Sequence, residues 1–184
     1  MRIVGGNFRG RNLKGPSSNA IRPTSDRLRE SIFNILVHAY NDPITGARVL
    51  YLFAGTGALA LEALSRGAKY ALFVEEAAEA RALIRENVEA LSLTGVTKIF
   101  RRDAGRLGDI GPIEPFDLVF CDPPYGQGLA EKSLASARDG KWLAPSALVV
   151  VEEAVAASFK TPEGFAELER RAYGDTEIMI ARAT

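Results

Sequence analysis

The sequence predicts a single α/β domain built around a mostly parallel β-sheet and preceded by a basic N-terminal arm. From Arg48 onward, short apolar segments alternate with segments of helical periodicity, a pattern typical of a doubly wound sheet. The length of 184 residues suits one domain, and 47% hydrophobic and 25% charged residues are ordinary values for a globular protein. We therefore expect the arm in residues 1–23 and the domain in residues 24–184.

The single cysteine, Cys121, excludes an internal disulfide framework and a cysteine-rich metal site. The first residues lack the apolar core of a signal peptide, and the longest apolar run, near residues 147–151, is too short to span a bilayer. We therefore expect a cytoplasmic protein that binds neither a membrane nor a metal.

The arm is rich in glycine and in basic residues. Its segments Arg2–Val4 and Asn7–Leu13 are expected to form the two short strands of a β-hairpin. Residues 1–30 contain seven basic and two acidic side chains, whereas the whole chain carries no net charge. A local cluster of this kind favours binding of a polyanion. The residues expected to contact nucleic acid are Arg9, Arg11, Arg22 and Thr24.

Helices and strands alternate after the arm. Thr24 or Ser25 can cap a first helix, which ends before Asn41–Pro43. Further helices are expected after the glycines at 55–57, ending near Ser65, and at residues 77–91 and 129–137. The expected strands of the main sheet are residues 49–53, 70–74, 98–101, 116–121 and 148–151. Residues 167–173 and 177–181 predict a hairpin that extends one edge of this sheet.

A glycine-rich turn, Phe53-Ala54-Gly55-Thr56-Gly57, joins the first strand of the sheet to a helix. Glycines let the backbone approach a ligand closely, and the helix N-terminus offers unpaired N–H donors. Glu75 ends the next strand, where its carboxylate could accept both hydroxyls of a ribose. Asp103 follows the third strand, from which it could reach an adenine amine, and Ala104 could line the adenine pocket. The set favours a cofactor that contains a nucleoside.

A second motif, Asp122-Pro123-Pro124-Tyr125, directly follows the apolar strand at residues 116–121. The two prolines end the strand and restrict the backbone at the edge where the glycine turn lies. The Asp122 carboxylate and the Pro123 carbonyl could accept the two hydrogens of an exocyclic amine and stabilise the charge that develops on methylation. Tyr125 could stack on an extruded base. The motif therefore predicts a catalytic site for methyl transfer to a nucleobase amine.

With these motifs the sequence resembles the RsmD-type family of 16S ribosomal RNA guanine-N2 methyltransferases, and the resemblance covers nearly the whole chain. It implies a Rossmann-like class I methyltransferase fold with a seven-stranded sheet, one reversed strand and an N-terminal β-hairpin. It also implies S-adenosylmethionine as the methyl donor and the N2 amine of a guanine in small-subunit ribosomal RNA as the acceptor. The matching segments are Arg22–Thr24, Asp26–Arg27, Arg29–Glu30, Leu52–Leu59, Glu62–Ala68 and Phe116–Tyr125.

One position departs from the family pattern. Tyr51 stands where the family usually has an aspartate, which helps to organise the amino-acid end of the donor. The substitution is expected to weaken donor binding or to shift this role to another acid.

Three other functions fit parts of the sequence. A DNA adenine-N6 methyltransferase shares the Asp122–Tyr125 motif, but such enzymes usually carry a larger target-recognition region. An NAD-dependent dehydrogenase shares the glycine turn but leaves Asp122–Tyr125 unexplained. A non-enzymatic RNA-binding protein on a methyltransferase scaffold would be consistent with Tyr51.

Overall fold

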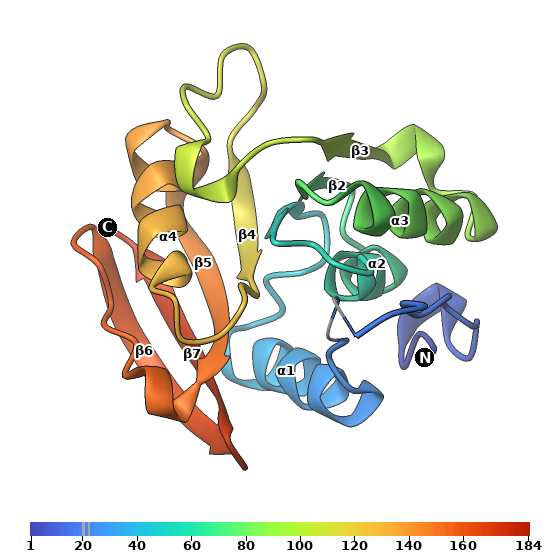
Figure 1. Ribbon diagram of the computed structural model, residues 1–184, viewed down its shortest axis with the longest axis horizontal. Coiled ribbons are helices and arrows are strands. Elements are labelled where there is room, and N and C mark those ends of the chain that lie inside the picture. The colour runs from blue at the N-terminus through green and yellow to red at the C-terminus, as the bar shows by residue number, and fades with distance from the viewer. Residues whose placement is uncertain (20, 22) are drawn as a thin grey trace.

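A computed structural model describes residues 1–19, 21 and 23–184, and contains one seven-stranded sheet in the order β3-β2-β1-β4-β5-β7-β6 (Figure 1). The strands are β1 (Arg48–Leu52), β2 (Tyr70–Val74), β3 (Thr97–Phe100), β4 (Phe116–Cys121), β5 (Leu143–Ala154), β6 (Phe165–Tyr173) and β7 (Thr176–Ala183). The helices are α1 (Asp26–Ala39), α2 (Ala58–Ser65), α3 (Ala78–Ala90) and α4 (Leu129–Asp139). Short 3-10 helices lie at Gly6–Phe8, Thr94–Val96, Ala104–Arg106 and Val155–Ala157.

The sheet confirms the expected fold class. Strands β1 to β5 are parallel, and β7 is antiparallel to both of its neighbours, β5 and β6. The apolar run at residues 148–151 predicted a shorter strand than the observed β5, which spans Leu143–Ala154. Its pairing with β7 continues past Val151 through Glu152, Glu153 and Ala154, so the charged residues there still belong to the strand.

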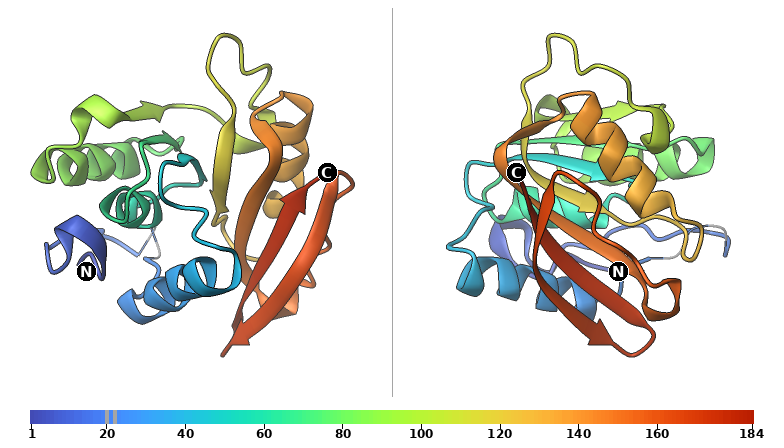
Figure 2. Two further views of the ribbon diagram at one scale, coloured as in Figure 1. Left: turned by 180° about the vertical axis from the view of Figure 1, so that it is seen from behind. Right: turned by 90° about the vertical axis from the view of Figure 1, so that its left-hand side faces the viewer.

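Helices cover both faces of the sheet, which explains why the central strands are apolar without alternation (Figure 2). Alternate residues of β1 face opposite sides: Val49 and Tyr51 pack with α1, α2 and α3, whereas Leu50 and Leu52 pack with α4. Among the described residues, no helix is long and apolar enough to cross a membrane.

The N-terminal segment differs from the expected pair of strands. Residues Arg2 and Asn12 form a single antiparallel bridge, and the 3-10 turn at Gly6–Phe8 lies between them. The backbone N–H groups of Val4 and Gly5 donate to the side chain of Glu62, each at 2.9 Å, instead of to a partner strand. The two segments still pair through the Ile3 N–H to the Arg11 carbonyl, the Gly10 N–H to the Ile3 carbonyl and the Leu13 N–H to the Met1 carbonyl, each at 2.9 Å. The expected hairpin is therefore present in a shortened form.

The arm and the domain share a core. Ile3 is fully buried and Leu13 is 5% exposed, and both belong to the apolar cluster that contains residues of α1 and α2. The side chain of Asn87 on α3 accepts a hydrogen bond from the Lys14 N–H at 2.7 Å and donates to the Lys14 carbonyl at 3.1 Å. The arm is thus packed into the domain.

Candidate active site

A cavity of about 470 Å³ opens at the carboxyl ends of β1, β2 and β4, where open α/β sheets bind their ligands. Cross-strand pairing places Leu52 level with both Val74 and Cys121, so the turns that follow these three strands meet at one edge. The cavity is lined by Asn19, Ile21, Thr24, Tyr51, Phe53, Ala54, Gly55, Thr56, Glu75, Ala77, Ala80, Asp122, Pro123, Pro124 and Tyr125. The structure therefore brings both sequence motifs into one site.

Glu75 ties the glycine turn to the end of β2. One of its carboxylate oxygens accepts the Gly55 N–H at 2.9 Å, and the other accepts the Ala77 N–H at 3.0 Å. Gly55 has a φ of 56°, and a Cβ there would lie 3.4 Å from the Ile21 methyl group and within 4 Å of no other described neighbour. Phe53 also has a positive φ, of 59°, which is unusual for a bulky side chain. The glycine turn therefore contains two residues with positive φ, Phe53 and Gly55, beside the carboxylate of Glu75.

The two glycines of the turn have different surroundings. Gly57 has a φ of 82°, does not line the cavity, and precedes the first residue of α2. A Cβ at Gly57 would lie 3.1 Å from the Phe73 ring and 3.4 Å from Ile84, both in the core. Gly57 is therefore needed for packing beneath the turn, and Gly55 is the glycine next to the cavity.

The Asp122–Tyr125 turn is held by residues from distant parts of the chain. The Asp122 N–H donates to the Leu52 carbonyl at 3.3 Å, which anchors the start of the turn on β1. The Thr24 hydroxyl lies 3.4 Å from the Asp122 carboxylate. The Tyr125 hydroxyl donates to Glu152 at 2.8 Å and lies 3.0 Å from the Thr176 hydroxyl. The side chains of Asp122 and Tyr125, to which the sequence assigns catalytic roles, therefore both contact residues from other parts of the chain.

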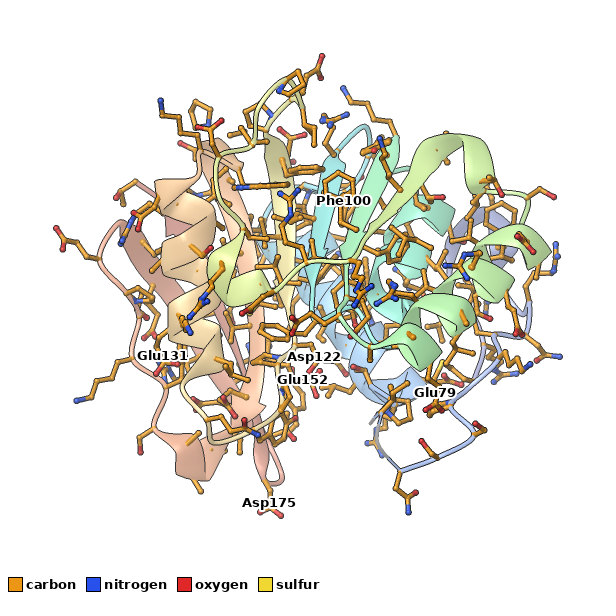
Figure 3. The ribbon with its side chains drawn as sticks, turned by 45° about the horizontal axis from the view of Figure 1, so that its top comes forward. Glu79, Phe100, Asp122, Glu131, Glu152 and Asp175 are labelled. Carbon is orange, nitrogen blue, oxygen red and sulfur yellow. The ribbon has the colours of Figure 1, made fainter. Side chains whose placement is uncertain are left out.

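Glu152 is a site residue that the sequence analysis missed. It is 4% exposed, and its carboxylate accepts hydrogen bonds from Thr24 at 3.0 Å and from Tyr125 at 2.8 Å. Because Cys121 pairs with Val151, Asp122 in the turn after β4 lies level with Glu152 in β5, and Figure 3 shows the two residues close together. The signal was present in the sequence, since two glutamates follow an apolar strand at the carboxyl edge of a parallel sheet.

Asp103 and Ala104 are not among the residues that line the cavity. The Asp103 carboxylate accepts the Gly105 N–H at 2.8 Å and caps the following 3-10 helix. Ala104 is 4% exposed and packs in the apolar cluster beneath α4. Their contact with a cofactor therefore stays a prediction.

Tyr51 forms part of the cavity wall and is 3% exposed. Its ring packs against Phe73 and Phe120, with centroids 6.4 and 6.1 Å away. Burial, followed by the negative charges of Asp122 and Glu152, raises the pKa of the Tyr51 hydroxyl well above its usual value. Tyr51 is therefore neutral and does not replace the negative charge of an aspartate.

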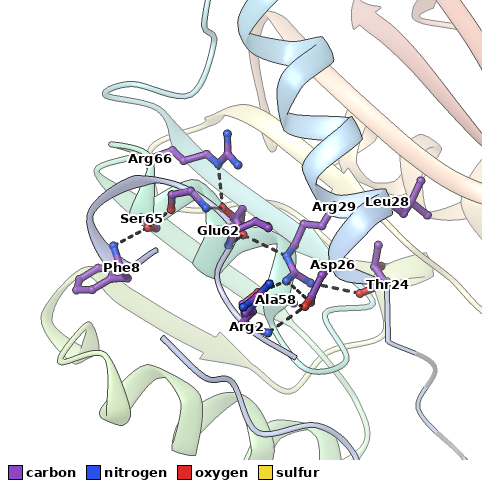
Figure 4. A network of polar contacts seen from close by, with 12 residues as sticks. Arg2, Phe8, Thr24, Asp26, Leu28, Arg29, Ala58, Glu62, Ser65 and Arg66 are labelled. Atoms are coloured by element: carbon purple, nitrogen blue, oxygen red, sulfur yellow. Dashed lines mark hydrogen bonds and ion pairs between the residues drawn. The ribbon is translucent and has the colours of Figure 1, made fainter. Parts of the chain in front are cut away.

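The basic residues of the N-terminal region have different roles in the structure. Arg9 and Arg11 are exposed, and Arg11 donates to the Ala90 carbonyl at 2.7 Å. Arg29 is fully buried and pairs with the fully buried Glu62 at 3.2 Å (Figure 4), so it is not available to a nucleic acid. Thr24 lies in the cavity wall. The expected contact by Arg22 falls outside the described residues.

Comparison with known proteins gives consistent matches over the chain. The family model described as "Conserved hypothetical protein 95" matches residues 1–182. The chain is 40% identical over 156 residues to "Ribosomal RNA small subunit methyltransferase D" of Escherichia coli, covering 84% of this chain and 75% of that protein. It is 34% identical to "Putative rRNA methyltransferase YlbH" of Bacillus subtilis, covering 98% and 97% of the two chains. A solved structure, "Putative methyltransferase yhhF from Escherichia coli", has a TM-score of 0.83 at 33% identity and covers 100% of this chain and 97% of its own.

Proposed function

Because the chain belongs to the RsmD family of ribosomal RNA methyltransferases, we propose that it transfers a methyl group from S-adenosylmethionine to a guanine N2 amine in small-subunit ribosomal RNA. The family expected from the sequence motifs is thereby confirmed. The finer proposal depends on one observation. The glycine turn with Glu75 and the Asp122–Tyr125 turn line the same cavity, so a nucleoside cofactor and an amine acceptor would meet there.

The residues of the cavity fit the proposed methyl donor. A volume of about 470 Å³ lies within the range of roughly 300–1,000 Å³ found for small-molecule and cofactor pockets. Each oxygen of Glu75 accepts one backbone N–H, and a carboxylate has about four acceptor positions, so positions remain for ribose hydroxyls. Phe53, Ala54, Gly55 and Thr56 line the side of the cavity beside Glu75. Gly57, Asp103 and Ala104 do not line it and belong to the proposed donor-binding set on the sequence motifs alone. When bound, S-adenosylmethionine would supply an electrophilic methyl group, because that group is bonded to the positively charged sulfur of a sulfonium.

The residues of the Asp122–Tyr125 turn would position and activate the acceptor amine. The Asp122 carboxylate and the Pro123 carbonyl would each accept one amine hydrogen, which favours a tetrahedral nitrogen and stabilises its developing positive charge. Asp122 would then take the proton that the methylated amine releases. Pro124 restricts the backbone of the turn, and the Tyr125 ring, fixed through its hydroxyl, would stack on the guanine.

The proposal is tested with two acceptors, small ribosomal subunits from cells that lack this protein and the 16S RNA extracted from them. After incubation with the protein and S-adenosylmethionine, mass spectrometry of the nucleosides should detect N2-methylguanosine in at least one acceptor. Calorimetry should show binding of S-adenosylmethionine and none of NAD. Methylation of adenine N6 in DNA, with no guanine product in RNA, would identify the DNA enzyme. RNA binding without donor binding would identify the non-enzymatic protein.

A further inference from the structure

A second cavity, of about 580 Å³, lies beside the candidate active site. Its walls come from the start of α1, from β5 and from the turn between β6 and β7. Within the described part of the chain, Thr24, which was expected to contact nucleic acid, is the one predicted site residue that lines it. Figure 3 labels Glu152, which lines this cavity, and Asp175, which lies between its lining residues Gly174 and Thr176.

The two cavities share a wall. Thr24 lines both, and its hydroxyl donates to Glu152, which lines the second cavity, at 3.0 Å. The Tyr125 ring lines the first cavity, while its hydroxyl lies 3.0 Å from that of Thr176, which lines the second. Groups bound in the two cavities would therefore be direct neighbours, as two consecutive nucleotides of one RNA strand are.

The residues of the second cavity suit a nucleotide. Tyr173 is a partly buried aromatic residue at the end of β6, and aromatic rings stack on unpaired bases. Arg27 is exposed on the first turn of α1 and could pair with a phosphate. The hydroxyl of Ser31 donates to the Arg27 carbonyl at 3.1 Å, and that of Thr176 lies 3.0 Å from the Tyr125 hydroxyl, which donates to Glu152, so both hydroxyl oxygens can accept from a sugar hydroxyl or a base amine.

The charges of the cavity favour one orientation of such a ligand. The Glu152 carboxylate lies at the wall shared with the active site, and Arg27 belongs to α1 on another wall. A carboxylate repels a phosphate and a guanidinium attracts it. On the basis of the proposed function, we propose that this cavity binds the RNA nucleotide next to the methylated guanine, with its base on Tyr173 and its phosphate toward Arg27.

The test compares single variants by methylation kinetics on whichever of the two acceptors, small ribosomal subunits or extracted 16S RNA, the wild-type protein methylates. Tyr173→Ala should raise KM for the RNA by about tenfold or more, the loss expected for one base–aromatic stack, with little change in kcat. Tyr173→Phe keeps the ring and should restore the wild-type KM. Tyr40→Ala is the matched control, because Tyr40 is also a partly buried tyrosine on the same apolar cluster but lines neither cavity. Arg27→Ala should raise KM and lower the log–log salt slope by about 0.7 to 0.9.

The outcomes separate this proposal from the proposed function. If the wild-type protein neither binds S-adenosylmethionine nor methylates RNA, the proposed function fails. If it methylates RNA and either Arg27→Ala or folded Tyr173→Ala retains the wild-type KM, this proposal is overturned alone. A loss confined to kcat would also overturn it, since the residues would then position the catalytic groups. Arg27 is exposed, so its variant decides the test even if Tyr173→Ala folds poorly.

Discussion

The hydroxyl of Thr24 lies 3.4 Å from the carboxylate of Asp122, although 98 positions separate the two residues. Thr24 precedes α1, while Asp122 begins the turn after β4. The segment that precedes α1 therefore lines the candidate active site and contacts the acid to which we assign the central chemical role.

Asp122→Ala should retain binding of S-adenosylmethionine and lose methylation activity. Removal of one group that stabilises charge in a transition state costs on the order of a hundredfold or more in kcat. Calorimetry with the donor and single-turnover methylation of RNA measure the two effects separately. Asp109→Ala is a suitable control, because Asp109 is an exposed loop acid whose carboxylate accepts the Gly111 N–H. Near-normal rates in folded Asp122→Ala would exclude this residue from catalysis.

Gly55→Leu and Gly57→Leu form a matched pair: the first should mainly lower donor affinity, and the second should mainly lower stability. Both glycines have a positive φ, so both variants carry a backbone cost of about 1–2 kcal/mol. At Gly57 the new side chain also meets Phe73 at 3.1 Å, and overpacking of a core costs roughly 1–3 kcal/mol more. Gly57→Leu should therefore melt at the lower temperature. Gly55→Leu should remain folded and lose donor affinity, and unchanged affinity in that variant would contradict the assignment of the glycine turn.

Deletion of residues 1–14 should strongly destabilise the domain. The deletion removes the buried side chains Ile3 and Leu13, each worth about 1.5–3 kcal/mol. It also removes the N–H donors of Val4 and Gly5 from the buried Glu62 carboxylate. Urea unfolding, followed by circular dichroism, measures the loss of free energy. A truncated protein as stable as the full chain would show that these contacts contribute little.

Arg9→Ala should test RNA contact by the arm without disturbing the fold, since Arg9 is exposed. If Arg9 contacts a phosphate, the variant should bind RNA less tightly. The log–log dependence of affinity on salt should become shallower by about 0.7 to 0.9. The measurement is RNA affinity at several salt concentrations, with donor affinity as the control. An unchanged slope would place the RNA-binding surface elsewhere.

The pair Tyr40 and Glu169 should make stability depend on alkaline pH. Burial and the hydrogen bond to Glu169, at 2.5 Å, raise the pKa of Tyr40 from 10.0 to about 12. The folded state thus holds this proton more tightly, and the resulting stability is fully present below pH 10 and lost as the pH rises to about 12. Tyr40→Phe should reduce the loss of stability over this range. The check is urea unfolding of both proteins at several pH values, and identical pH profiles would contradict the prediction.

Much of the fold was determined by local sequence. The apolar strands and the helical segments between them predicted a parallel sheet, and the structure has it. The glycine turn and the Asp122–Tyr125 turn could be placed in one site, because each directly follows an apolar strand. The carboxyl ends of parallel strands share an edge, so this position follows from a rule of topology.

Only the tertiary structure decided the contacts between distant residues. Glu152 accepts a hydrogen bond from Thr24, 128 positions away, and Glu62 accepts one from the Val4 N–H, 58 positions away. No local sequence pattern signals either hydrogen bond. The hairpin expected in the arm is short: Arg2 and Asn12 form its bridge, and the N–H groups of Val4 and Gly5 bind the buried Glu62 carboxylate instead of extending the pairing. Strand and turn propensities are encoded over a few neighbouring residues. The choice of a partner for a buried charge depends on which segments the whole fold brings together, because such a charge is costly unless it is paired.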